Sequence, residues 1–199
     1  MVEEALAAPD EPRVLIIEEI NRGNPAMIFG ELLTLIEVSK RTPAAAMHLI
    51  YAPPGDEPVY IPGNLFIIGT MNMADRSLAM LDIALRRRFA FVELKPLFND
   101  LWMDWMVNSV GMPKAMAEEI RRRIQQVNAK ISSNNNLGQH CVIGHSYVTP
   151  GRSLELSKFS KWYHDVVTTE LVPLLDEYFL DYPEDLQECR NILIPDLPQ

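Results

Sequence analysis

Two runs of apolar residues in this sequence do not alternate with polar ones. The first is Val14-Leu15-Ile16-Ile17 and the second is Leu65-Phe66-Ile67-Ile68. Unbroken apolar runs of this length are typical of parallel strands that are buried on both faces. We therefore predict strands over 13–18 and about 65–70, and a third over "FAFVEL" (89–94). Two shorter β-prone pieces, 48–51 and 59–61, flank a Pro/Gly/Asp tip and predict a hairpin-like excursion.

Elsewhere the apolar residues recur at helical spacing. Ile28, Leu32, Leu35 and Ile36 predict one helix that begins at Pro25 and runs to about residue 41. Residues 2–8 predict a short helical end, and Ser77 is in place to cap a helix over 77–88. After Pro96 the pattern predicts helices at roughly 98–110, 113–132 and 153–180, the last one interrupted at Pro173.

Strands and helices alternate before Pro96, and helices dominate after it. This order predicts an α/β part followed by an all-helical part. We place the division at 1–95 for the α/β subdomain and 96–199 for the helical subdomain.

Composition narrows the possible functions. The formal net charge is -9, which disfavours a chain whose main surface binds nucleic acid. Cys141 and Cys189 are far apart and form no CxxC pair, as expected for reduced intracellular thiols. No apolar run approaches the roughly 20 residues that span a bilayer, and the start lacks a signal-peptide pattern. We expect a cytoplasmic protein without a membrane partner.

Polar residues follow both apolar strands. Glu18 and Glu19 come directly after the first, and Asn72 follows the second. In open α/β sheets, ligands bind at the carboxyl ends of parallel strands, so if the strands are neighbours these side chains converge. Two acids and an amide suit Mg²⁺, which uses one or two carboxylates with waters and phosphates. The alternative is a strand that ends at the surface with two solvated acids.

Four segments in this order carry a more specific pattern: "LIIEEINRGN", "IFGELLTLIE", "NLFIIGTMNMADRSLAMLDIALRRRF" and "LGQHCVIGHSYV". Together they resemble the McrB family of AAA+ nucleoside-triphosphatases, the motor subunits of modification-dependent restriction endonucleases. The resemblance runs from about Arg13 to Leu186. It implies the second part of an AAA+ P-loop NTPase core followed by the helical lid.

The resemblance assigns roles to single residues. "VLIIEE" resembles a Walker B strand, with Glu18 as the Mg²⁺-associated acid and Glu19 as the acid that activates water. Glu18 departs from the family's usual Asp by one methylene, and magnesium geometry is strict. The other implied catalytic positions are Asn72 (sensor 1), Asp75 and Arg76 (the "MNxADR" signature), and Arg87 and Arg88 (arginine fingers).

Further candidates lie in the second half. By the resemblance, "IGHSYV" lies near the nucleotide, with His145 and Ser146 as its contacts. His140, Cys141 and His145 fit no standard zinc spacing, so we expect no zinc site. Arg121, Arg122 and Arg123 spread around a helix because consecutive residues point about 100° apart.

A phosphate cradle of the form GxxxxGK[ST] is absent from these 199 residues. In the family this Walker A motif precedes the Walker B strand. The chain therefore looks like the C-terminal portion of a longer motor. We expect that alone it binds nucleotide weakly, is inactive and folds marginally, because two sheet edges lack their central strand.

The resemblance implies GTP or ATP as substrate, Mg²⁺ as cofactor, a homo-oligomeric, hexameric ring of the full-length form, and a McrC-like nuclease subunit. DNA would be reached through that complex rather than through this chain. A MoxR-like AAA+ chaperone is the alternative of related architecture. A non-catalytic interaction protein, left by truncation of a motor gene, is the alternative of another class.

Overall fold

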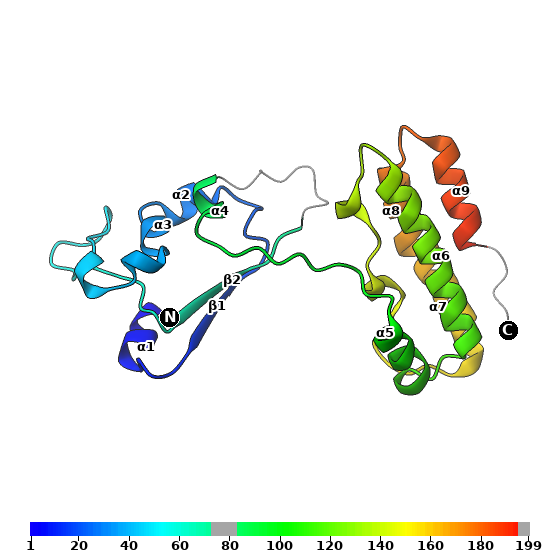
Figure 1. The fold of residues 1–199 in the computed structure, drawn as a ribbon, viewed down its shortest axis with the longest axis horizontal. Helices are drawn as coiled ribbons and strands as arrows, with labels where there is room; N and C mark the ends of the chain where they lie inside the picture. Colours follow the sequence, from blue (N-terminus) through cyan, green and yellow to red (C-terminus); the bar gives the residue numbers. More distant parts are fainter. Residues whose placement is uncertain (73–82, 195–199) are drawn as a thin grey trace. The chain divides into compact units, whose positions relative to one another are not determined.

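The computed structural model describes residues 1–72 and 83–194 (Figure 1). The chain divides into two compact units, Met1–Val92 and Glu93–Gln199. The predicted site residues Asp75 and Arg76, and the cap at Ser77, lie outside the described residues.

The first unit is organised around a two-stranded parallel sheet. β1 (Arg13–Ile17) pairs with β2 (Leu65–Gly69), with Arg13 opposite Leu65 and Ile17 opposite Gly69. Both strands confirm the prediction from their apolar runs. Because the strands are parallel and in this register, their carboxyl ends are level with each other.

One face of this sheet packs on the core of the unit. Leu65 is 2% exposed and contacts a cluster that includes Leu35 and Ile36, with Leu15 and Ile67 packed against it. The prediction of burial on both faces is wrong for the described residues. The side chains of the opposite face are about half exposed: Val14 48%, Ile16 61%, Phe66 53% and Ile68 51%.

Short helices surround the covered face. The predicted helix from Pro25 to residue 41 is not continuous. It breaks at Gly30, whose φ of +48° is left-handed and incompatible with an α-helix. The elements of this unit besides the strands are α1 (Val2–Ala7), α2 (Pro25–Phe29), α3 (Leu32–Leu35), η1 (Val38–Lys40), η2 (Pro43–Ala45) and α4 (Ile83–Arg86).

Of the two remaining β predictions, the hairpin-like excursion is confirmed in part and the third strand is wrong. The excursion over 48–61 contains one isolated antiparallel bridge, Met47 with Val59, rather than a hairpin ladder. Residues 89–94 form no strand. Val92 and Leu94 are 81% and 90% exposed, and no neighbouring strand in the described part of the chain offers them a hydrogen-bond ladder.

The second unit is helical, as predicted. The long helix α6 (Lys114–Ser133) buries Ile120, Ile124, Val127 and Ile131 along one face. α9 (Pro183–Leu193) packs against α6 and α8 (Val172–Tyr178), so these helices run side by side (Figure 1). The other elements are α5 (Asp100–Asp104), η3 (a π-helical turn, Trp105–Ser109), η4 (Gln139–Cys141), η5 (His145–Val148), η6 (Leu156–Lys158), α7 (Phe159–Val166), η7 (a π-helical turn, Val167–Leu171), α8 (Val172–Tyr178) and α9 (Pro183–Leu193).

Helix boundaries in this unit follow local chemistry. Asn99 caps α5 by accepting a hydrogen bond from the Trp102 amide at 3.1 Å. The predicted interruption near Pro173 is a π-helical turn just before it. None of the helices among the described residues combines the length and apolarity required to cross a bilayer.

Candidate functional site

The carboxyl ends of β1 and β2 are joined by hydrogen bonds that continue past the strands. The Thr70 amide donates to the Ile17 carbonyl at 3.0 Å, and the Ile20 amide donates to the Thr70 carbonyl at 3.0 Å. The segment with the two glutamates therefore lies beside the segment 70–72. This is the juxtaposition that the sequence predicted if the strands were neighbours.

The backbone of Glu19 is strained. Its φ is +51°, and it is the single non-glycine residue with positive φ among the described residues. A side chain larger than glycine pays a steric cost there, on the order of 1–2 kcal/mol. The turn is held by the Glu19 amide, which donates to Thr70 Oγ1 at 3.1 Å, and by the Arg22 amide, which donates to the Glu19 carbonyl at 2.8 Å. Strain of this kind, held by its surroundings, is frequent at functional sites.

The two adjacent carboxylates differ in their partners. Glu19 forms an ion pair with Arg22, and its side chain is 47% exposed. The Glu18 side chain is exposed, and its carboxylate has no hydrogen-bond or ion-pair partner among the described residues. An unengaged carboxylate open to water fits Mg²⁺, which retains several waters and needs few protein ligands. The Glu18 carboxylate is therefore open to water, whereas the Glu19 carboxylate is engaged.

Asn21 links the two strand ends and was missed in the sequence. It is 5% exposed, and its Nδ2 donates to the Asn72 carbonyl at 3.3 Å. Its Oδ1 is buried without a hydrogen-bond partner in the described part of the chain. An amide two residues after the acids was the available signal, but only the pairing of the strands shows that it reaches segment 70–72.

Gly69 allows the two ends to approach closely. A Cβ at this position would lie 3.1 Å from both Cδ1 and Cγ2 of Ile20. Packing thus explains the glycine at the end of "FIIG", because Ile20 fills the space that a side chain would occupy.

The predicted interface arginines have different environments. Arg88 forms an ion pair with Glu37 at 2.5 Å, and its side chain is 16% exposed. Arg87 is exposed. Arg86 lies over the Phe91 ring, 5.6 Å from its centroid. Arg88 is held inside its own unit, whereas the Arg87 side chain is open to an external partner.

His145 and Ser146 lie in η5 of the second unit. His145 is partly buried, and its Nδ1 accepts a hydrogen bond from the Leu97 amide at 3.2 Å. Ser146 is exposed. Across residues 1–72 and 83–194, no group of three or more His, Cys, Asp or Glu side chains is arranged to hold a metal ion.

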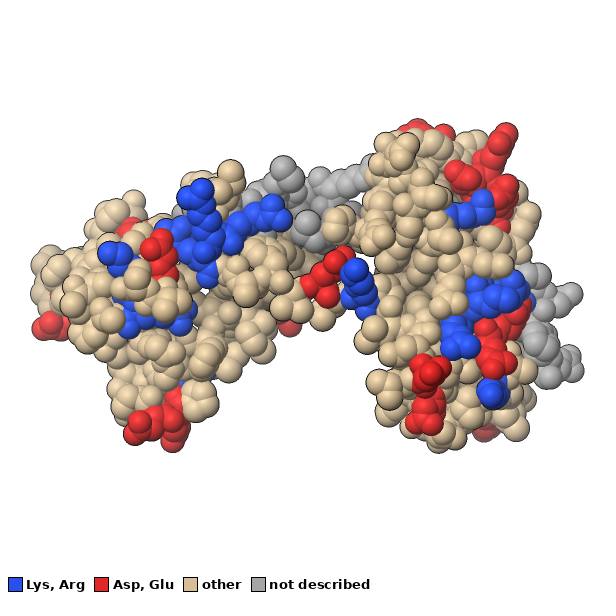
Figure 2. All heavy atoms as spheres, in the orientation of Figure 1, with Lys and Arg blue, Asp and Glu red and all other residues tan. Residues whose placement is uncertain are grey.

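Charge on the second unit is mixed. On the face drawn in Figure 2, basic side chains there occur in small groups beside acidic ones. Arg122 pairs with Glu119 at 2.6 Å, and Arg123 pairs with the same carboxylate at 2.7 Å. Two of the three arginines in the run 121–123 therefore form ion pairs within the helix.

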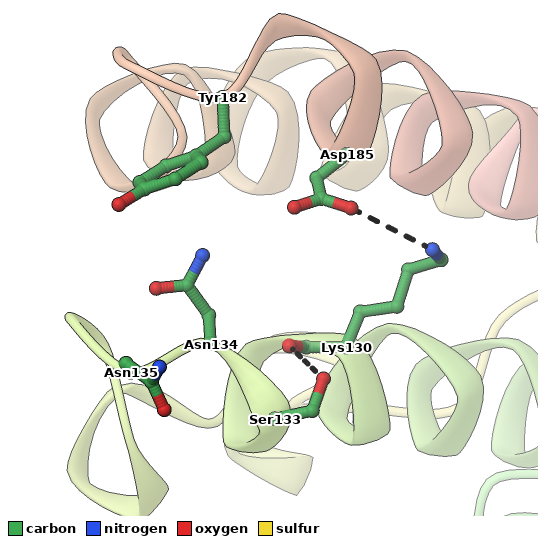
Figure 3. A pocket seen from close by; sticks show the side chains of 6 residues that line it. All are labelled: Lys130, Ser133, Asn134, Asn135, Tyr182 and Asp185. Carbon is green, nitrogen blue, oxygen red and sulfur yellow. Dashed lines mark hydrogen bonds and ion pairs between the residues drawn. The ribbon is translucent and has the colours of Figure 1, made fainter.

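A pocket of about 280 Å³ lies between the end of α6 and the start of α9 (Figure 3). Its Lys130 ammonium lies 3.9 Å from Asp185 and also pairs with Glu188, which raises the pKa of Lys130. The Tyr182 hydroxyl accepts a hydrogen bond from Asn136 at 2.6 Å. None of the predicted site residues lines this pocket, and its cation is already neutralised by acids.

Comparisons with known proteins match both units. Residues 1–89 match the model of the AAA domain of the dynein-related subfamily, and residues 119–187 match the model of the alpha-helical lid domain of McrB.

Two relatives come from restriction systems. Over 196 residues, 98% of its length, the chain is 37% identical to the type IV methyl-directed restriction enzyme EcoKMcrB subunit of Escherichia coli K12, and covers 42% of that protein. Over 91 residues, 41% of its length, it is 37% identical to component YdiS of the type II restriction enzyme BsuMI of Bacillus subtilis 168, and covers 26% of it. The chain thus spans less than half the length of either relative.

Proposed function

The chain belongs to the McrB family of AAA proteins, and from this premise we propose that it supplies the Walker B-to-lid part of an NTPase. The NTPase would hydrolyse GTP or ATP and drive a DNA restriction complex in the cytoplasm. The observation that carries the proposal is the joined carboxyl end of β1 and β2, where Glu18 and Glu19 lie beside segment 70–72. Residues 1–95 would form the catalytic α/β subdomain and 96–199 the lid.

Glu19 is the proposed general base. It would take a proton from the attacking water as the water oxygen bonds to the terminal phosphorus and the bond to the leaving diphosphate breaks. The left-handed turn held by Thr70 supports this role, because it aims a side chain away from the strand direction at a defined place. To act as base, the Glu19 carboxylate would have to exchange its ion pair with Arg22 for the water.

Glu18 is the proposed holder of Mg²⁺. A magnesium ion bound here would neutralise charge on the phosphates. The exposure of Glu18 and its lack of a partner among the described residues support this assignment. Asn72 would orient the water, and its backbone carbonyl is already held by Asn21. Asp75 and Arg76 keep their proposed catalytic roles by resemblance.

The remaining roles involve partners. Of the two predicted interface arginines, Arg87 is proposed to reach the site of a neighbouring subunit in a homo-oligomeric ring, with Arg88 held beside it by Glu37. A McrC-like nuclease would be driven by that ring. His145 and Ser146 are proposed to act on the nucleotide from the lid. The net charge of -9 and the mixed charge on the lid support contact with DNA through the complex rather than through this chain.

The matched McrB lid favours this reading over a MoxR-like chaperone. The non-catalytic alternative is separated by experiment. In the E. coli McrB subunit, the 196 residues that align with this chain would be replaced by it, so that the rest of that protein surrounds the proposed site. We expect nucleotide hydrolysis by the chimera.

Glu19→Gln is the decisive variant, because it is nearly isosteric but cannot accept the proton. It should retain nucleotide binding and lose turnover by about 100-fold or more, the range typical of general bases. Thr70→Val, which removes the hydroxyl that holds the turn, should give a smaller loss. A folded, nucleotide-binding chimera that does not hydrolyse would favour the non-catalytic alternative. Equal rates for Glu19→Gln and wild type would refute the assigned base.

The chain by itself gives a complementary test. Because its sequence lacks GxxxxGK[ST], we expect no turnover and only weak binding when GTP or ATP is titrated with Mg²⁺. Binding at micromolar concentration with turnover would contradict the proposal that a phosphate cradle must be added.

A further inference from the structure

His145 lies at the centre of a small cluster at the start of the second unit. Its Nδ1 accepts from the Leu97 amide at 3.2 Å, and its carbonyl accepts from the Thr149 hydroxyl at 2.6 Å. The Thr149 oxygen in turn accepts from the Trp102 indole at 2.8 Å. The Phe98 ring stands edge-on to both Trp102 and His145, with centroids 5.3 and 6.2 Å away.

This cluster holds a segment that forms no helix or strand. Residues 90–97 belong to no helix or strand, and Val92 and Leu94 are more than four-fifths exposed. Leu97 is itself 55% exposed, so its side chain adds little burial. The hydrogen bond to His145 and the Phe98 ring are therefore the contacts that tie this segment to η5.

The hydrogen bond also assigns the tautomer of His145. A backbone amide only donates, so Nδ1 must carry a lone pair, and the ring proton of the neutral imidazole is on Nε2. Protonation of Nδ1 would place two donors against each other and break the contact.

We infer that His145 is a positioning residue that uses its two ring nitrogens differently: Nδ1 fastens the entry segment Leu97–Phe98 to η5, and Nε2–H is the ring donor left for a ligand. The first role is independent of nucleotide. It makes His145 the point at which the lid begins as a rigid body, with the exposed residues before Leu97 free to change conformation. The proposed nucleotide contact of His145 would then use Nε2 alone.

Two substitutions separate the ring nitrogens. His145→Asn places an amide oxygen near the position of Nδ1, and His145→Gln places its amide near the position of Nε2. The Asn variant should retain acceptance from the Leu97 amide, whereas the Gln variant should lose it. Ser146→Ala, at the exposed neighbouring residue, is the matched control.

The measurement is amide hydrogen exchange of Leu97 in the 199-residue chain without nucleotide. We expect exchange about five-fold faster in His145→Gln, the factor given by one net hydrogen bond of about 1 kcal/mol. It should be close to wild type in His145→Asn and in Ser146→Ala. Nitrogen NMR of wild-type His145 should show the Nε2–H tautomer.

The outcomes are distinct from those of nucleotide assays, so this inference can fail while the proposed function stands. An Nδ1–H tautomer would overturn it. Equal Leu97 exchange in all four proteins would do the same. Equally fast Leu97 exchange in the Asn and Gln variants would show that ring packing alone holds the segment.

Discussion

At the residue scale, the sequence pattern predicted which residues belong to the candidate site but not which contacts they make. The two acids after an apolar run marked Glu18 and Glu19 as candidates, because charged pairs at a strand end need a reason. Their different partners could not be read from the sequence, since the Arg22 ion pair and the left-handed φ of Glu19 arise from the turn. Thr70 and Asn21 were missed because their contacts cross 51 residues of chain.

The arginines of "LRRRF" give a residue-scale prediction. Arg88→Ala should destabilise the first unit by about 1 kcal/mol, because it removes the ion pair with Glu37 while water can still reach that carboxylate. Arg87→Ala should change stability by less than about 0.5 kcal/mol, since the side chain is exposed. Chemical denaturation of the 199-residue chain measures both.

Of these two arginines, Arg87 can also be tested in the catalytic chimera. Arg87→Ala should lower hydrolysis while leaving folding intact, and mixing it with Glu19→Gln subunits should restore part of the activity if sites are shared across an interface. Full activity of Arg87→Ala would show that it is not the finger.

At the element scale, the sequence predicted those elements whose apolar pattern coincides with burial. β1, β2 and α6 are of this kind. The helix from Pro25 was predicted too long, because its apolar spacing continues across Gly30 while the backbone does not. The composition of "FAFVEL" favours a strand, but a strand also requires a neighbouring strand to which its backbone can hydrogen-bond. α9 was missed although Pro183, Glu184 and Asp185 form a regular helix start.

The packing of α6 on α9 leads to a prediction about pH. Arg122 and Arg123 lower the pKa of Glu119 to about 2. Arg123 is 2% exposed and also donates to the Leu193 carbonyl at the end of α9. A carboxylate with a lowered folded-state pKa stabilises the fold above its unfolded pKa, and this contribution is lost as pH falls toward the folded value.

The second unit should therefore lose stability between about pH 4.5 and 2, the span between the ordinary and the folded pKa of Glu119. Glu119→Gln should be less stable at pH 7, because Arg123 no longer has this carboxylate, and should lose less on acidification. Denaturant unfolding at pH 7 and pH 3 compares the two proteins. It can be followed by tryptophan fluorescence, because all three tryptophans of the chain lie in the second unit. An equal loss in both would exclude Glu119 as the source.

At the scale of the whole molecule, the two units differ in how completely they are packed. The helical unit packs its long helix α6 against α9, and Phe159, Leu175 and Leu193 of α7, α8 and α9 are almost completely buried. In the described residues of the first unit, the sheet has two strands, and one of its apolar faces is about half exposed. A pair of strands with one covered face gains little stability in water. We therefore predict that the marginal folding expected from the sequence arises in the first unit rather than in the second.

We accordingly predict that the chain unfolds in two steps, the first unit before the second. Amides of β1 and β2 should exchange with solvent sooner than those of α6, because local stability follows buried contacts. Leu65→Ala, at a residue 2% exposed, should weaken only the first step, by about 2–5 kcal/mol or by abolishing it, and Ile124→Ala, in the core of α6, only the second. Phe66→Ala, on the exposed sheet face, should cost far less than Leu65→Ala in the adjacent position. Thermal unfolding with residue-resolved exchange distinguishes this from a single cooperative transition, in which both core substitutions would shift the same midpoint and the two units could not be stable independently.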